Sequence, residues 1–411
     1  MTIAMQTGAN APLDNTASRL SLPDDQATDP AAWREIRYGL RRTAGKVIGG
    51  RVKDCGHAAV GTTVGIVRGD YGGHHFSGIE TCGSVWVCPV CAARITERRR
   101  EEVKGTLEAA LDEGSKAAMF TLTIPHTRFD DLGTLRRGVS KCWEKVQAGV
   151  GWKAMKARTG FIGSIRALEV THGGNGWHPH LHVVIVFDQG LNQERLSGFS
   201  SELFARWARA VEREGFGVCS EKAFSVESIH DAEGVSKYRQ KWGAAEELTK
   251  AHVKKGREGG RTPFQILADI HDAEHAEVIE GGERKKLRQD RALFSDYSSS
   301  FKGARQLTWS RGLRQKYLGD PEQTDEEIAG DEPASSDHEA NTEAFISRDV
   351  WRPIAKAGLQ GQILTAMDRG GSKAVSALLK QKGIRFCQGE LVGLHGNVVT
   401  IFNSAGVDPP T

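Results

Sequence analysis

The chain has 411 residues, of which 39% are hydrophobic and 26% are charged, the ordinary balance of a globular protein with two or three domains. No apolar run approaches the roughly 20 residues needed to cross a bilayer, which excludes a membrane-spanning protein. The N-terminus lacks the basic start and apolar block of a signal peptide, so we expect a cytoplasmic protein with no membrane partner.

The net charge of +3 hides an uneven distribution. Residues 320–344 contain ten Asp or Glu and no Lys or Arg, so the rest of the chain is clearly basic. A basic body favours an anionic partner, most commonly nucleic acid. The seven cysteines are an odd number, and four lie close together in the sequence; in a reducing compartment this favours metal binding over disulfides.

Residues 1–30 are polar and rich in Pro and Asp, and we predict that they are disordered. Residues 31–115 are predicted to form a zinc-binding module and a basic helix, because "CGSVWVCPVCAARI" holds a C-P-x-C turn followed by a helix. Tetrahedral zinc needs four ligands, which we expect to be Cys55, Cys82, Cys88 and Cys91, with His57, His74 and His75 as substitutes for one of them. Redox chemistry at C-x-x-C is less favoured, since no thioredoxin-type pattern surrounds it. The remaining cysteines, Cys142, Cys219 and Cys387, are expected to be core thiols.

The basic helix "RITERRREEV" follows the cysteine segment directly. It could track phosphates of a nucleic acid. It could equally be a solvated helix face, because Glu alternates with Arg, and the sequence does not decide between these alternatives.

Residues 116–250 alternate between strands and helices. Strands are predicted at 117–124, 161–171, 180–187 and 223–229, and helices at 132–150, 192–215 and 232–250. The order is βαββαβ followed by a helix. This predicts the α+β class with a ferredoxin-like antiparallel sheet and helices on one face.

The stretch "GWHPHLHVVIVF" places histidines ahead of a buried apolar strand. Alternate strand residues share a face, so His180 and His182 point the same way. A hairpin turn centred in "GGNG" sets Glu169 beside them on that face. Two imidazoles and one carboxylate with open positions suit a catalytic divalent metal such as Mg or Mn. The alternative is a pair of hydrogen-bonded histidines at the rim of a sheet.

The stretch "KYRQKW" places Tyr238 and Lys241 on one face of a predicted helix. A nearby Lys and a metal-polarised phosphate would each help a tyrosine to act as a nucleophile. An exposed Tyr–Lys pair is the alternative, and the position of this helix after the fourth strand favours the catalytic interpretation.

The last third of the chain is less informative. Residues 251–319 are predicted to form a helical extension, 320–344 an acidic linker, and 345–411 a small C-terminal domain of two helices and short β segments. That domain is compatible with a winged-helix-like DNA binder, with an oligomerisation element or with helicase recruitment. An ATP motor is excluded, because "DRGGSKAV" does not fit a P-loop.

With these motifs in order, the chain resembles the HUH endonucleases, and among them the rolling-circle replication initiators of bacterial plasmids. "MFTLTIPHT", "HPHLHVVIV" and "VSKYRQK" resemble the three family motifs, and the cysteine segment resembles the one that these initiators carry ahead of the nuclease. "TPFQIL" and "ARQLTWSRGLR" look like flanking segments of actinobacterial members.

The resemblance implies that His180 and His182 hold the metal with Glu169 as third ligand, and that His178 supports them. Tyr238 would attack a scissile phosphate in single-stranded or hairpin DNA of a plasmid origin, with Lys241 orienting that phosphate. The 5′ phosphate would become linked to the tyrosine, and the free 3′-OH would prime a host polymerase, with a host helicase opening the duplex. Whether the protein is a homo-oligomer is left open.

The chain departs from the family pattern at one position. Some relatives carry a Glu four residues before the tyrosine, but Gly234 stands there, with Glu233 one step further back, which puts the termination mechanism in doubt. Tyr297 and Tyr317 lie far from the motif, which disfavours a two-tyrosine transposase. A transposase or mobilisation relaxase with the same chemistry remains an alternative, as does a zinc-dependent DNA-binding regulator without catalysis.

Overall fold

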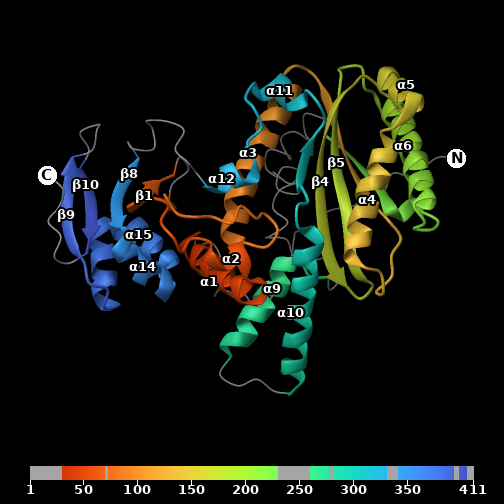
Figure 1. Ribbon diagram of the computed structural model, residues 1–411. Helices are drawn as coiled ribbons and strands as arrows, with labels where there is room; N and C mark the ends of the chain where they lie inside the picture. The colour runs from red at the N-terminus through yellow and green to blue at the C-terminus, as the bar shows by residue number, and fades with distance from the viewer. Residues whose placement is uncertain are drawn as a thin grey trace.

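Two five-stranded sheets organise the chain (Figure 1). The computed structural model describes residues 30–69, 73–229, 260–276, 281–330, 341–392 and 398–404. The first sheet has the order β6-β3-β5-β4-β7 and the second has the order β2-β1-β8-β10-β9. None of the described helices is both long and apolar enough to cross a bilayer.

The first sheet is antiparallel throughout. Its strands are β3 (Lys116–Thr123), β4 (Phe161–Gly173), β5 (Gly176–Phe187), β6 (Phe224–Ser228) and β7 (Leu307–Trp309). The helices α4 (Leu132–Val146), α5 (Gly149–Thr159) and α6 (Gln193–Arg213) connect them. The predicted α+β class is therefore confirmed, and the four predicted strands of this region are present.

The helices α4 and α6 begin at side-chain caps that the sequence provides. Asp131 accepts a hydrogen bond from the Thr134 amide, and Asn192 accepts one from the Arg195 amide. The single helix predicted for 132–150 is instead divided, because Ala148 is extended and Gly149 has a φ of 83°. Only glycine adopts that backbone conformation readily, so a new helix, α5, starts there.

Helices cover both faces of the first sheet, whereas the sequence predicted helices on one face. The helices α4 and α6 pack on the face that carries Leu181 and Val183. The helices α3 (Pro89–Asp112) and α11 (Leu313–Leu318) pack on the face that carries Val184 and Val186. The reason lies in β5 itself, because its apolar residues occupy both faces of the strand, and each face must be buried.

The second sheet joins the two ends of the described chain. Its strands β1 (Thr63–Arg68) and β2 (His74–Ser77) come from the predicted zinc module, and β9 (Cys387–Val392) and β10 (Val398–Asn403) from the predicted C-terminal domain. The strand β8 (Thr342–Ser347) begins within the predicted acidic linker 320–344 and continues into that domain. β1 pairs with β8 over Thr63–Val67. The segments 31–115 and 345–411 thus share one sheet.

The helices that pack around this sheet are α1 (Pro30–Ile48), α14 (Arg348–Ala357) and α15 (Gln360–Gln381), whereas the short α2 (Gly50–Asp54) packs on α1. The indole of Trp351 on α14 lies edge-on to Phe76 on β2, with ring centroids 4.7 Å apart, and donates a hydrogen bond to the His57 carbonyl. The core of this unit is therefore built from both ends of the sequence.

The segment between the two sheets contains more regular structure than the sequence indicated. The helical extension consists of α9 (Pro263–His275), α10 (Gly281–Phe301) and α11, with β7 inserted at the edge of β4. The predicted acidic linker begins with a helix, α12 (Asp325–Gly330), that packs on α3. Asp325 accepts a hydrogen bond from the buried Arg99, so acidic residues here neutralise a cation of the basic helix.

The shared sheet predicts a long-range effect on stability. Trp351 is fully buried, and Trp351→Ala should lower the free energy of unfolding by about 4 kcal/mol, because it leaves a cavity between β2 and α14. Chemical denaturation measures this loss. The matched control is Arg352→Ala, whose side chain is 70% exposed and which should change stability little. Equal stability of the two variants would contradict the shared core.

Candidate functional site: two groups of metal-ligand residues

The hairpin of β4 and β5 sets the geometry of the first group. The strands pair from Phe161 opposite Phe187 to Gly173 opposite Gly176, and Gly176 has a φ of 83°. In this register Glu169 lies directly opposite His180. Because His182 is two residues further along β5, all three side chains project from one face of the sheet.

Their ligand atoms converge on one point. Glu169 Oε2 lies 3.4 Å from His180 Nε2 and 3.5 Å from His182 Nε2. The other ring nitrogens have partners, since His180 Nδ1 lies 3.2 Å from the His178 carbonyl and His182 Nδ1 lies 3.1 Å from Thr121 Oγ1. When Nδ1 carries the proton, Nε2 presents a lone pair, as metal ligation requires. The three residues can therefore hold a metal ion.

Two further residues border this group, and the sequence reasoning did not single them out. Thr121 on β3 lies opposite His182 and orients its ring. His126, just after β3, has its ring centroid 4.8 Å from that of His178. Burial, together with the imidazoles of His180 and His126, lowers the pKa of His178 to about 4, so this ring is neutral at physiological pH. The signal was present in "MFTLTIPHT", where Thr121 alternates with the apolar face of the strand.

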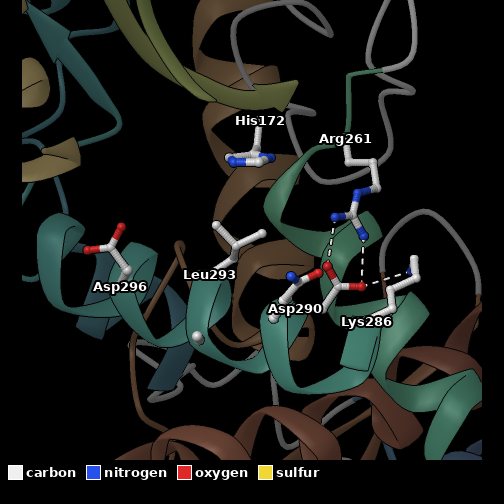
Figure 2. A pocket seen from close by; sticks show the side chains of 8 residues that line it. His172, Arg261, Lys286, Asp290, Leu293 and Asp296 are labelled. Carbon is white, nitrogen blue, oxygen red and sulfur yellow. Dashed lines mark hydrogen bonds and ion pairs between the residues drawn. The ribbon is translucent and has the colours of Figure 1, made fainter. Parts of the chain in front are cut away.

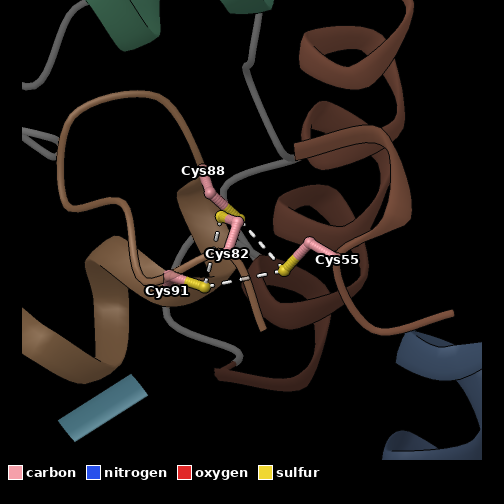
Figure 3. A group of neighbouring side chains, drawn as sticks. All are labelled: Cys55, Cys82, Cys88 and Cys91. Atoms are coloured by element: carbon pink, nitrogen blue, oxygen red, sulfur yellow. Dashed lines mark hydrogen bonds between the residues drawn. The ribbon is translucent and has the colours of Figure 1, made fainter. Parts of the chain in front are cut away.

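The second group contains the four cysteines that the sequence predicted as zinc ligands (Figure 3). Cys55 follows α2, Cys82 and Cys88 precede α3, and Cys91 lies in its first turn. The sulfur of Cys55 is 3.7 Å from that of Cys88 and 3.6 Å from that of Cys91, and the Cys82–Cys91 distance is 3.7 Å. Tetrahedral zinc with Zn–S bonds of about 2.3 Å requires sulfur atoms about 3.8 Å apart. This buried group can therefore bind a metal ion such as zinc.

The thiols of this group share protons with one another. Hydrogen bonds, of which the one with Cys82 has the largest effect, lower the pKa of Cys55 well below its usual value. Hydrogen bonds, of which the one with Cys55 has the largest effect, and burial raise the pKa of Cys88. A bound dication removes this competition, because it favours the thiolate form of every ligand.

Arg41 on α1 lies against the cysteine group. Its side chain is 1% exposed, and one guanidinium nitrogen donates a hydrogen bond to the Cys55 carbonyl. Its Nε and its second terminal nitrogen have no hydrogen-bond partner among the described residues. A buried cation is costly unless a negative charge lies nearby. Four thiolates around a dication carry a net charge of −2, which would supply that charge.

The other residues that the sequence singled out lie away from the two groups or outside the described residues. His57 and His74 are not members of the cysteine group: His57 Nδ1 lies 3.4 Å from Arg41, and His74 lies between Glu343 and Asp368. Cys142 and Cys219 are buried as expected, whereas Cys387 is exposed on β9, contrary to its prediction as a core thiol. Tyr238 and Lys241 lie in 230–259, outside the described residues.

Residues 76–354, which include Glu169, His180, His182 and three of the four cysteines, match the replication protein family Rep_1. The chain belongs to this family of replication proteins. Replication proteins act on DNA, in agreement with the basic composition of the chain outside its acidic segment.

Two curated relatives resemble this member of the Rep_1 family. It is 25% identical over 343 residues to a protein named Protein rep from Streptomyces lividans, covering 69% of this chain and 74% of the relative. It is 32% identical over 136 residues to a protein named Neomycin resistance protein from Streptomyces cyanogenus, covering 26% of this chain and 31% of that protein. No solved structure matches the chain.

The cysteine geometry predicts one bound zinc ion whose loss destabilises the protein. Cys88→Ser should abolish zinc retention, measured by elemental analysis after gel filtration, because one of four ligands is lost. Cys142→Ser, at an equally buried thiol outside the group, should retain zinc. Retention of zinc by both variants, or by neither, would contradict the assignment.

The position of Arg41 beside the cysteine group predicts that its charge strengthens zinc binding. Arg41→Met should weaken zinc affinity by about tenfold or more, because the charge that faces the thiolates is removed. Arg42→Met, at the adjacent exposed position on α1, should leave the affinity unchanged. Competition with a chromogenic chelator measures both, and equal affinities would show that Arg41 does not balance the site.

Proposed function

We propose that the protein is an HUH endonuclease that initiates rolling-circle replication of a plasmid by nicking its origin. The observation that carries this proposal is the convergence of Glu169, His180 and His182 on one face of an antiparallel sheet. A metal held there by three ligands keeps open positions, which a structural metal site does not.

The arrangement of the first sheet supports a ferredoxin-like HUH core. Its first four strands in chain order, β3, β4, β5 and β6, are connected as βαββαβ. In space they follow the order fourth, first, third, second, with β7 added at the edge. The face of β4 and β5 that carries the three ligands is opposite the one on which α4 and α6 pack. The helices α3 and α11 cover the part of this face around Val184 and Val186, and we propose that DNA approaches the part near the hairpin turn.

The proposed reaction transfers a phosphoryl group to Tyr238. Glu169, His180 and His182 would hold Mg or Mn, which supplies Lewis-acid polarisation of the scissile phosphate. The Tyr238 oxygen attacks phosphorus and loses its proton, the bond to the 3′ oxygen breaks, and that oxygen takes up a proton. The products are a 5′-phosphotyrosine and a free 3′-OH primer. Lys241 would orient the phosphate and favour the phenolate.

The segment from the end of β6 to Tyr238 is long enough for Tyr238 to reach the metal ligands. Ile229, at the end of β6, donates its amide to the Ala117 carbonyl and is buried on the ligand face. Along β3, four residues or about 13 Å separate Ala117 from Thr121, which adjoins His182. The nine residues from Ile229 to Tyr238 cover about 13 Å even at the rise of a helix.

The remaining parts of the proposal concern partners. The DNA would be single-stranded or extruded as a hairpin at the origin, and a host polymerase would extend the 3′-OH. A host helicase would unwind the duplex, because the sequence has no P-loop. We propose a structural role for zinc at the cysteine group and a cytoplasmic location for the protein.

Trapping of a covalent adduct tests the nucleophile. With manganese and a supercoiled plasmid that carries its own gene and origin, the wild-type protein should form a DNA adduct that survives denaturation. Tyr238→Phe should form none, because it lacks the attacking oxygen. Tyr317→Phe is the matched control and should retain the adduct. A full yield of adduct from Tyr238→Phe would overturn the assignment of the nucleophile.

Substitution of a ligand tests the metal site independently. His182→Ala should lower the nicking rate by about a thousandfold, since metal stabilisation of transition-state charge contributes several kcal/mol. His275→Ala, at an exposed histidine on α9, should nick at the wild-type rate. Zinc content should be unchanged in both variants. Normal nicking by His182→Ala would contradict a catalytic role for the histidine pair.

A further inference from the structure

A pocket of about 670 Å³ lies beside the end of the β4–β5 hairpin, between that hairpin and α10 (Figure 2). It is separate from both metal-ligand groups. His172 forms its upper wall in this view and Leu293 the opposite one, with their side chains pointing toward each other. Arg261, Lys286, Gln289, Asp290, Ala292 and Asp296 complete the lining.

The wall formed by His172 is held firmly in place. His172 and Arg261 exchange two backbone hydrogen bonds of 2.8 Å each, and the imidazole packs against Trp177 at a ring distance of 4.8 Å. Burial and the nearby Arg261 lower the pKa of His172. Its ring is therefore an uncharged aromatic surface at neutral pH, suited to contact with another flat ring.

The charges at one side of the pocket neutralise one another. Arg261 binds both carboxylate oxygens of the buried Asp290, at 2.7 and 2.9 Å, and Lys286 reaches the same carboxylate at 2.9 Å. Both cations also bind Asp269. The pocket thus offers little net charge for an anion, and its walls suit a neutral planar group.

We propose that this pocket binds one unstacked base of single-stranded DNA, between His172 and Leu293. The inference deepens the proposed function and rests on it, because it names a subsite for the DNA substrate. Splayed bases commonly stack on aromatic side chains, and an apolar side chain can cover the other face of the base.

The surface of α10 next to the pocket provides for the phosphates. Its first half exposes five cations: Arg284, Lys285, Lys286, Arg288 and Arg291. Of these, Lys285 and Arg288 form no ion pair with any residue in the described part of the chain. Charge complementarity therefore favours a polyanion such as DNA. One base would enter the pocket, and the phosphates on either side of it would lie over α10.

Asp296 indicates which bases are favoured. Its carboxylate accepts hydrogen bonds from the Trp177 indole at 3.1 Å and from Ser300 Oγ at 3.4 Å, which fix it at the edge of the pocket. A carboxylate has further acceptor capacity and no donor. It favours a base with an exocyclic amine, such as cytosine, over thymine, which presents carbonyl oxygens there.

The pocket lies close enough to the proposed cleavage site to hold the same DNA strand. The His172–Trp177 pair is three residue pairs from the Glu169–His180 pair, or about 10 Å along the hairpin. By strand alternation, His172 faces the opposite side of the sheet from Glu169. The bound DNA would therefore pass around the hairpin turn at Gly173–Gly176. Binding of one base in the pocket would fix the position of the DNA relative to Glu169, His180 and His182.

Filling the slot tests the inference. Ala292 is exposed on α10 and lines the pocket, so Ala292→Leu should weaken binding of a fluorescent oligo(dC) by about tenfold, because the base loses its site. Ser295→Leu adds the same side chain at an exposed position of α10 outside the pocket and should bind normally. Both should melt as the wild type does. Equal affinities of these two variants would overturn the proposal.

A second measurement tests base selectivity. The wild type should bind oligo(dC) about fivefold more tightly than oligo(dT), and Asp296→Asn should remove this preference, because an amide both donates and accepts. An unchanged preference in Asp296→Asn would refute the role of Asp296. These assays measure binding without cleavage: if the wild type binds no oligonucleotide, the proposed function fails, whereas DNA binding that is insensitive to Ala292→Leu refutes only the pocket.

Discussion

The register of β4 against β5 is the constraint on which the candidate site depends. Side chains alternate along a strand, so a slip of one residue would turn His180 and His182 away from Glu169 and bury them among the aliphatic residues under α4 and α6. From Val183 onward both faces of β5 are apolar, so the alternation near the turn decides the register: Trp177 and Leu181 face that core, and the histidines face away from it. Burial of these two apolar side chains therefore determines where the three polar residues project.

A second constraint links the cysteine group to this sheet through α3. The helix begins beside Cys88, carries Cys91 in its first turn, and ends by packing Val103 and Leu107 on the ligand face of the first sheet. The positive end of its dipole lies at the sulfur atoms and favours thiolates. A metal bound by these cysteines would thus tie α2, the segment before α3 and the helix itself into one rigid support for the first sheet.

Local patterns predicted most of the first sheet and both ligand groups. Alternation marked the strands, the turn "GGNG" set Glu169 opposite His180, and the spacing of four cysteines identified the second group. Long-range contacts were not predictable. Neither the pairing of β1 with β8, nor the docking of the three-residue strand β7 on β4, has a periodic signal in the sequence. The burial of Arg41 beside Cys55 depends on how α1 folds back, which the local sequence does not encode.

The proposed catalytic metal site at Glu169, His180 and His182 can be examined by anomalous diffraction at the manganese edge, from crystals of the full chain grown with manganese. We expect a peak about 2.2 Å from Nε2 of both histidines and from a carboxylate oxygen of Glu169. A peak at another place, or no peak while zinc is present at the four cysteines, would contradict the proposed site.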